Sequence, residues 1–357
     1  MPHRLSLVRQ AARLRRLYTG ETDSTLLPAV TDAITRFSAD GRATFREILD
    51  QGYETRLFGE NSVPSVDQRF RDAVLSDATN TLQQQLEAGI LFALGQIAPY
   101  RWPATKVVAP MPLCRMVRPV QSSGETILHL QAGVLAPVMA VLTPHVLNGR
   151  LHGLAGLRAS VKRRHVQLHL ADGDPNQIVG LSNTSFRQWA GALAFTQNVI
   201  GSEQLPVLDG PLTTAEISAI RTGCRVPGPV ALASGVFRRL QVLGDTYWLT
   251  GRPDGPDGLR LEWAGGRSAV KVATALVHPL AGLAGEQFYV TRMADGSVTV
   301  IITGISGEPT TKLTLYQAPL TVTPPFTRVD VTSAWSEFRR TMAATNFAPI
   351  HRELVAR

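Results

Sequence analysis

Basic and hydrogen-bonding side chains gather in the segment LRASVKRRHVQLHL, residues 157–170. Alternate residues of a strand point to opposite faces of a sheet. The apolar residues at 166, 168 and 170 are therefore expected to face a core, and Arg163, His165, Gln167 and His169 to face outward. Arginine and lysine contact phosphates, and glutamine can reach a base edge in a groove. The segment predicts a nucleic-acid contact, with the solvated face of an ordinary sheet as the alternative.

Metal binding by the same segment is not expected. His165 and His169 are four residues apart, which is about 13 Å along a strand and too far for one ion, and the neighbouring positive charge repels a cation. The segment ADGDPNQ at 171–177 copies the first half of a calcium loop, but it lacks the glycine of the sixth position and the glutamate of the twelfth. We predict a hairpin turn there, and neither a metal site nor a cofactor.

Motifs of common enzymes are absent from the sequence, which holds no Gly-x-Ser-x-Gly elbow, no His-Glu-x-x-His pair and no phosphate-binding glycine loop. No catalytic residue is assigned. Catalytic residues need not be neighbours in sequence, so an enzyme with a site that is invisible in the sequence is the third alternative. Cys114 and Cys224 show no Cys-x-x-Cys spacing and are expected to be buried thiols.

The formal net charge of +8 is concentrated in one block of the sequence. Residues 1–100 hold 11 arginines and 12 acids, residues 101–165 hold nine basic residues and one acid, and residues 166–357 hold 16 basic and 15 acidic residues. Such a concentration indicates an anionic partner. The predicted contacts in or beside this block are Arg115, Arg118, Arg158, Lys162, Arg163, Arg164, His165, Gln167 and His169.

Helical patterns occupy the first hundred residues. Apolar residues at 7, 11, 14 and 18 recur at helical spacing, while Arg9, Arg13 and Arg16 fall on the opposite face. This spacing predicts an amphipathic helix that ends near Gly20 and exposes the three arginines as further nucleic-acid contacts. A longer helix is predicted from about Val66 to Ala98, where prolines stop it.

Short alternating segments follow from residue 110 and predict strands and turns. Two units repeat the order strand, helix, three strands; TILHLQAGVLAPVMAVLTPHV aligns with LRLEWAGGRSAVKVATALVHPL. The predicted elements are strands at 126–130, 157–163, 166–170 and 178–182 with helices at 133–146 and 183–198, then strands at 259–263, 287–293, 298–303 and 312–316 with a helix at 268–277. A unit that exposes one apolar face is stabilised by packing against a copy of itself. The predicted fold class is α+β, an N-terminal helical domain followed by a duplicated βαβββ body with antiparallel sheets.

This topology resembles the βαβββ units of DNA polymerase sliding clamps, in which helices line a pore around the duplex. The resemblance covers residues 126–182 and 259–316 and implies that the helix over 133–146 faces DNA. That segment contains no basic side chain except His145. The resemblance therefore indicates topology rather than function.

The predicted domains are a helical domain at 1–98, a basic α+β unit at 99–200, a linker at 201–229, a second α+β unit at 230–325 and a C-terminal helix and tail at 326–357. The longest apolar runs are shorter than the roughly 18 to 20 residues that a bilayer requires, and the N-terminus does not resemble a signal peptide. We therefore expect a cytoplasmic protein with no membrane partner.

The favoured function is a non-enzymatic accessory protein that binds nucleic acid, with duplex DNA as the first choice, through the basic surface of residues 101–165. The alternative is a structural or adaptor protein that docks an acidic protein partner on the same surface. In that case the long helical stripe is expected to be buried in a homo-oligomer.

Overall fold

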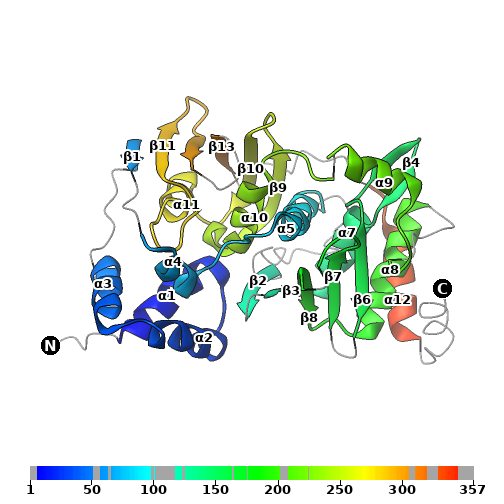
Figure 1. Ribbon diagram of the computed structural model, residues 1–357. Coiled ribbons are helices and arrows are strands. Elements are labelled where there is room, and N and C mark those ends of the chain that lie inside the picture. Colours follow the sequence, from blue (N-terminus) through cyan, green and yellow to red (C-terminus); the bar gives the residue numbers. More distant parts are fainter. Residues whose placement is uncertain are drawn as a thin grey trace.

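Two mixed sheets flank a central pair of helices in the computed structural model of the protein (Figure 1). The structure describes residues 6–50, 57–62, 66–97, 100, 117–122, 125–162, 165–174, 176–201, 208–223, 225–304, 310–319 and 329–344. None of the helices in these ranges is both long and apolar enough to cross a membrane.

Within the described residues, five helices precede the first long strands: α1 (Leu7–Thr19), α2 (Asp23–Thr35), α3 (Ala39–Asp50), α4 (Gln68–Val74) and α5 (Thr81–Leu94). The predicted first helix is confirmed. The Ser6 hydroxyl accepts a hydrogen bond from the Arg9 amide at its start, and Gly20 ends it at φ 67°, a left-handed conformation that glycine adopts without strain.

The single long helix predicted over Val66 to Ala98 is wrong, because the chain breaks between α4 and α5. Asn80 caps α5 by accepting hydrogen bonds from two amides of its first turn. In the break, the Asp77 carboxylate accepts a 2.5 Å hydrogen bond from Arg239, and the Ser76 carbonyl accepts one from Arg238. The apolar stripe is buried inside the molecule, so the described residues do not offer it to an oligomer.

The duplicated body is shown by the topology of the two sheets. The first sheet consists of β2 (Val117–Ser122), β3 (Glu125–Leu130), β6 (Leu157–Val161), β7 (Val166–Leu170) and β8 (Ile178–Ser182), in the order β2-β3-β8-β7-β6. The second consists of β1 (Gly59–Ser62), β9 (Thr246–Pro253), β10 (Gly258–Gly265), β11 (Gln287–Arg292), β12 (Val298–Thr303) and β13 (Thr311–Ala318), in the order β1-β11-β12-β13-β10-β9. Read from its other edge, the second sheet has the order β9-β10-β13-β12-β11, followed by β1. Without β1, this order corresponds strand for strand to β2-β3-β8-β7-β6 of the first sheet.

Two details of the predicted body need correction. The sheets are mixed rather than antiparallel, because β3 pairs with β8 and β10 pairs with β13 in parallel. The first crossover helix, α7 (Ala132–Leu142), ends before His145, which begins the hairpin β4 (His145–Leu147) and β5 (Arg150–His152). Residues 134–140 of α7 are all buried, so this helix does not line a pore as the sliding-clamp resemblance implied.

The remaining helices pack around this body. They are α8 (Phe186–Ile200), α9 (Thr214–Arg221), α10 (Val230–Arg238), a short 3-10 helix η2 (Leu240–Leu243), α11 (Ala269–Leu276) and α12 (Thr332–Ala343). Figure 1 shows α5 and α10 between the two sheets, and α12 beside α8. Helix α5 precedes the first unit but contacts β9 of the second, and α10 contacts β2 of the first.

Arginine–carboxylate pairs join these buried elements. Glu87 of α5 is fully buried and accepts two hydrogen bonds from the Arg238 guanidinium of α10, at 2.8 and 2.7 Å. It also accepts from the Ser234 and Thr126 hydroxyls and from the Gln83 amide. Both oxygens of this buried carboxylate are therefore satisfied by donors from the surrounding elements.

Candidate functional site

The predicted basic segment forms an antiparallel hairpin at one edge of the first sheet. Strands β6 and β7 pair from Leu157↔Leu170 to Val161↔Val166, and the Lys162 amide donates a 2.9 Å hydrogen bond to the His165 carbonyl next to the turn. Both Lys162 and His165 are exposed. Arg163 and Arg164, which connect them in the sequence, lie outside the described residues.

The predicted division of the β7 side chains between two faces is confirmed. Val166, Leu168 and Leu170 are at most 3% exposed and belong to the core, while Gln167 and His169 are half-buried on the other face. The strand therefore carries its hydrogen-bonding residues away from the core, in continuation of the exposed end that Lys162 and His165 mark.

Arg158 does not belong to this exposed surface, so its predicted role as a nucleic-acid contact is wrong. Its guanidinium is buried and donates to both oxygens of Glu216, at 2.9 and 3.2 Å. Further hydrogen bonds from it reach the carbonyls of Leu157, Gly210 and Pro211. All its donors are directed inward, where they fix α9 and the segment before it to β6.

The pKa values of Glu216 and His169 agree with a buried Arg158 and a hydrogen-bonding outer face of β7. Burial tends to raise the pKa of Glu216, but hydrogen bonds from Arg158 and from the amides of Thr213 and Gly156 hold it at about 2. Burial lowers the pKa of His169, and the charges of Arg158 and Lys162 lower it further. His169 is therefore a neutral hydrogen-bonding group near pH 7 rather than a cation.

The other predicted contacts lie on different elements. Arg9, Arg13 and Arg16 are exposed on α1, and Arg16 forms an ion pair with Asp23 of α2. Helix α1 contacts β2, the edge strand opposite to β6. Four strand spacings of about 4.8 Å put these edges about 19 Å apart, so the α1 arginines and the β6–β7 hairpin are separate surfaces.

Two predicted arginines cannot be placed on either surface. Arg118 lies on β2 opposite His129, but its side chain is not among those that the structure describes. Arg115 lies outside the described residues.

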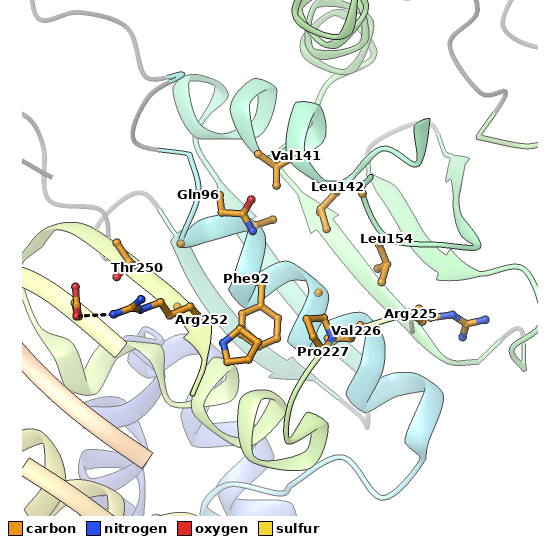
Figure 2. A pocket seen from close by; sticks show the side chains of 17 residues that line it. Phe92, Gln96, Val141, Leu142, Leu154, Arg225, Val226, Pro227, Thr250 and Arg252 are labelled. Atoms are coloured by element: carbon orange, nitrogen blue, oxygen red, sulfur yellow. Dashed lines mark ion pairs between the residues drawn. The ribbon is translucent and has the colours of Figure 1, made fainter. Parts of the chain in front are cut away.

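A pocket of about 590 Å³ lies between the two units, and sequence reasoning missed it. Its apolar lining comes from α5, α7, the turn after β5 and the segment before α10: Phe92, Ala93, Val141, Leu142, Leu154, Val226 and Pro227. In Figure 2, Phe92 and Pro227 lie in the middle, with Thr250 and Arg252 at one end and Arg225 at the other. This volume is within the range of about 300 to 1,000 Å³ that is typical of ligand pockets.

Polar groups at both ends of the pocket have unused hydrogen-bonding capacity. The Thr250 hydroxyl and the Arg225 Nε are buried, and neither has a hydrogen-bond partner among the residues that the structure places. Arg225 is held by Asp172 and Gln85 through its other nitrogens, and Arg252 approaches Glu262 at 3.6 Å. Buried polar atoms are normally satisfied, so these two atoms are exceptions within the part of the chain that the structure describes.

Neither the β6–β7 hairpin nor the pocket has the composition of a metal centre. Within the described ranges, no group of three or more His, Cys, Asp or Glu side chains could hold a metal ion. No family model, curated protein or solved structure matches this chain. Any assignment of function therefore depends on the geometry of these two places.

Proposed function

We propose that this protein is a nucleic-acid-binding accessory protein that contacts its ligand through the β6–β7 hairpin. The carrying observation is the exposed end of that hairpin, where Lys162 and His165 bracket two arginines of the sequence. No acidic residue occurs from position 126 to position 171, so no nearby carboxylate in the sequence offsets this charge. A two-stranded ribbon fits the major groove of duplex DNA, and cationic side chains at its end can reach phosphates.

The half-buried residues behind the hairpin end add hydrogen-bonding groups rather than charge. Gln167 and His169 lie on the outer face of β7, and Ser160 lies opposite Gln167 on β6. These groups suit contacts with sugars or base edges. Because His169 is neutral near pH 7, the fixed charge of the site comes from Lys162 and the two arginines that follow it.

Binding to random duplex DNA at several salt concentrations tests the proposal. Replacing Lys162, Arg163 and Arg164 by glutamine should weaken binding at about 50 mM salt and reduce the slope of log K against log salt by at most about 3, because each lost phosphate contact contributes about 0.9. Fluorescence anisotropy of a labelled duplex measures both quantities.

A matched control removes the same charge elsewhere. Arg36, Arg42 and Arg46 are exposed on the N-terminal helices, and replacing them by glutamine should leave the salt slope almost unchanged. Equal loss of affinity in both triple variants would show that net charge alone drives binding. Absence of binding to duplex or single strands by the unmodified protein at this salt would end the proposal in favour of an acidic protein partner.

A further inference from the structure

The two units share a short motif that makes their positions comparable. The sequence Gly-Leu-Ala-Gly occurs at 153–156 and again at 282–285. The Leu154 amide donates to the Leu142 carbonyl at the end of α7 at 2.9 Å, and the Leu283 amide donates to the Leu276 carbonyl at the end of α11 at 2.7 Å. The same turn therefore follows the crossover helix in both units.

The central helices contact these turns in the same way. A Cβ on Gly89 of α5 would meet the Leu154 side chain at 2.9 Å, and one on Gly235 of α10 would meet Leu283 at 3.0 Å. Each glycine allows its helix to approach the leucine of its unit. Gly89 and Gly235 are thus equivalent, and counting along each chain segment makes Gly95 equivalent to Gln241.

This equivalence identifies the place in the second unit that corresponds to the pocket, and it shows which residues fill that place. Gly95, Gly153 and Val141 line the open pocket, and their counterparts are Gln241, Gly282 and Ala275. All three counterparts are contacted by the N-terminal helices. Gly20, which ends α1, lies against the Gln241 side chain. Arg71 of α4 donates to the Gly282 carbonyl at 2.8 Å, and the Tyr18 hydroxyl of α1 donates to the Ala275 carbonyl at 2.8 Å.

Tyr18 is the central group of this contact. It is 2% exposed, its ring lies edge-on to His278, and burial raises its pKa above the ordinary range. Its counterpart acceptor in the open pocket is the Val141 carbonyl, which lies in the last turn of α7 and so has no acceptor role within the helix. The open pocket therefore offers an acceptor where the filled one binds a tyrosine hydroxyl.

We infer that the pocket between the units docks an amphipathic helix of a partner protein, in the place that α1 and α4 take in the other half. The open site is more apolar than the filled one, because Phe92 and Ala93 occupy the positions of Arg238 and Arg239. It suits a helix with an aromatic residue near its C-terminal end, and with acidic groups that complement Arg252, whose side chain is 65% exposed. This inference does not depend on nucleic-acid binding.

A peptide of the protein's own first helix, residues 6–22, is a suitable probe because the two sites are equivalent. Its exposed Arg9, Arg13 and Arg16 are replaced by glutamate in a second version, which should bind more tightly because of Arg252. Fluorescence anisotropy of the labelled peptides with the full-length protein should show saturable binding. A Tyr18→Ala peptide should bind at least about ten-fold more weakly.

Variants of the full-length protein locate the binding. Val141→Glu and Gln96→Trp change partly or fully exposed residues of the pocket wall, and each should weaken peptide binding at least about ten-fold. Val146→Glu, on the exposed β4 strand, is the matched control and should bind like the unmodified protein. Far-ultraviolet circular dichroism confirms that each variant is folded, and either wall variant suffices if the other fails to fold.

Three results would overturn the inference. The first is no saturable binding of either peptide up to about 1 mM, which is weaker than a specific helix contact requires. The second is binding that neither wall variant affects, because the peptide would then occupy another surface. The third is uptake of an apolar dye that the peptide cannot displace, which would identify the pocket as a small-molecule site.

Discussion

Exchange of Arg158 or Lys162 for glutamine separates an interior arginine from a surface cation within one hairpin. Both residues were expected to bind the same anionic partner, and they lie four positions apart in the sequence. Arg158 is 4% exposed and donates five hydrogen bonds to Glu216 and to three carbonyls, whereas Lys162 is exposed. The two substitutions should therefore act on different properties of the protein.

The magnitude for Arg158→Gln follows from the partner that it leaves behind. Removing one member of a buried ion pair typically costs about 3 to 5 kcal/mol, because the remaining charge is buried without compensation. Glu216 keeps the hydrogen bonds from the Gly156 and Thr213 amides, at 3.0 and 2.8 Å, so we expect the lower end of this range. Lys162→Gln should change the free energy of unfolding by less than about 0.5 kcal/mol.

Urea unfolding followed by circular dichroism measures both effects, and duplex binding of the folded fraction supplies the second readout. Only Lys162→Gln should lower the salt slope, by about 0.9. The double variant Arg158→Met with Glu216→Leu should be more stable than Arg158→Gln, because both charges leave together. A loss below about 1 kcal/mol for Arg158→Gln would refute the buried pair.

Other changes should have effects of predictable sign. The pKa of Glu216 is held at about 2 in the fold, so its ionised form contributes about 3 kcal/mol to the free energy of unfolding. This contribution is present above the ordinary pKa of the carboxyl and is lost as the pH falls towards 2. Urea unfolding from pH 6 to pH 2.5 measures the loss. Gly95→Ala should lower the melting temperature, because its Cβ would lie 2.4 Å from a backbone nitrogen of β9, whereas Gly133→Ala, which meets nothing within 4 Å, should not. Arg15→Gln should cost about 3 kcal/mol by breaking a buried pair, and Arg16→Gln less than about 0.5 kcal/mol, as compared by chemical unfolding.

Local patterns predicted the elements whose structure depends on neighbours in the sequence. The strands over 166–170, 178–182 and 298–303 have the predicted bounds, because alternation and turn residues specify them locally. The same alternation separated the inward Val166 from the outward Gln167. Helix α1 was predictable for an equivalent reason, since its apolar spacing and its terminal glycine lie within one segment.

Contacts between distant segments were not predictable from these patterns. Nothing near Arg158 indicates that Glu216, 58 positions away, will neutralise it. The break before α5 likewise depends on Arg238 and Arg239, which approach from more than 150 positions further along the chain. Charge counting therefore overestimated the exposed positive surface, because it treats every arginine as available to solvent.

The pocket could have been suspected from one signal in the sequence. The repeated Gly-Leu-Ala-Gly motif marks the same turn in both units, and it lies within the duplicated segments. Its role became apparent only with the contacts to Gly89 and Gly235. A pocket between units is formed by residues from several elements, and periodicity within any one of them does not reveal it.

The reciprocal packing of α5 on β9 and of α10 on β2 has a consequence for the ancestry of the fold. Helix α5 also contacts β7 and β8 of its own unit, so it lies between two sheets. A chain with a single unit would therefore leave one side of its leading helix to the sheet of a second copy, as in a two-fold symmetric dimer. Joining two copies in one polypeptide removes the requirement for identical subunits. Each half can then change separately, and in this chain α1 and α4 contact the second unit at positions whose counterparts line the open pocket.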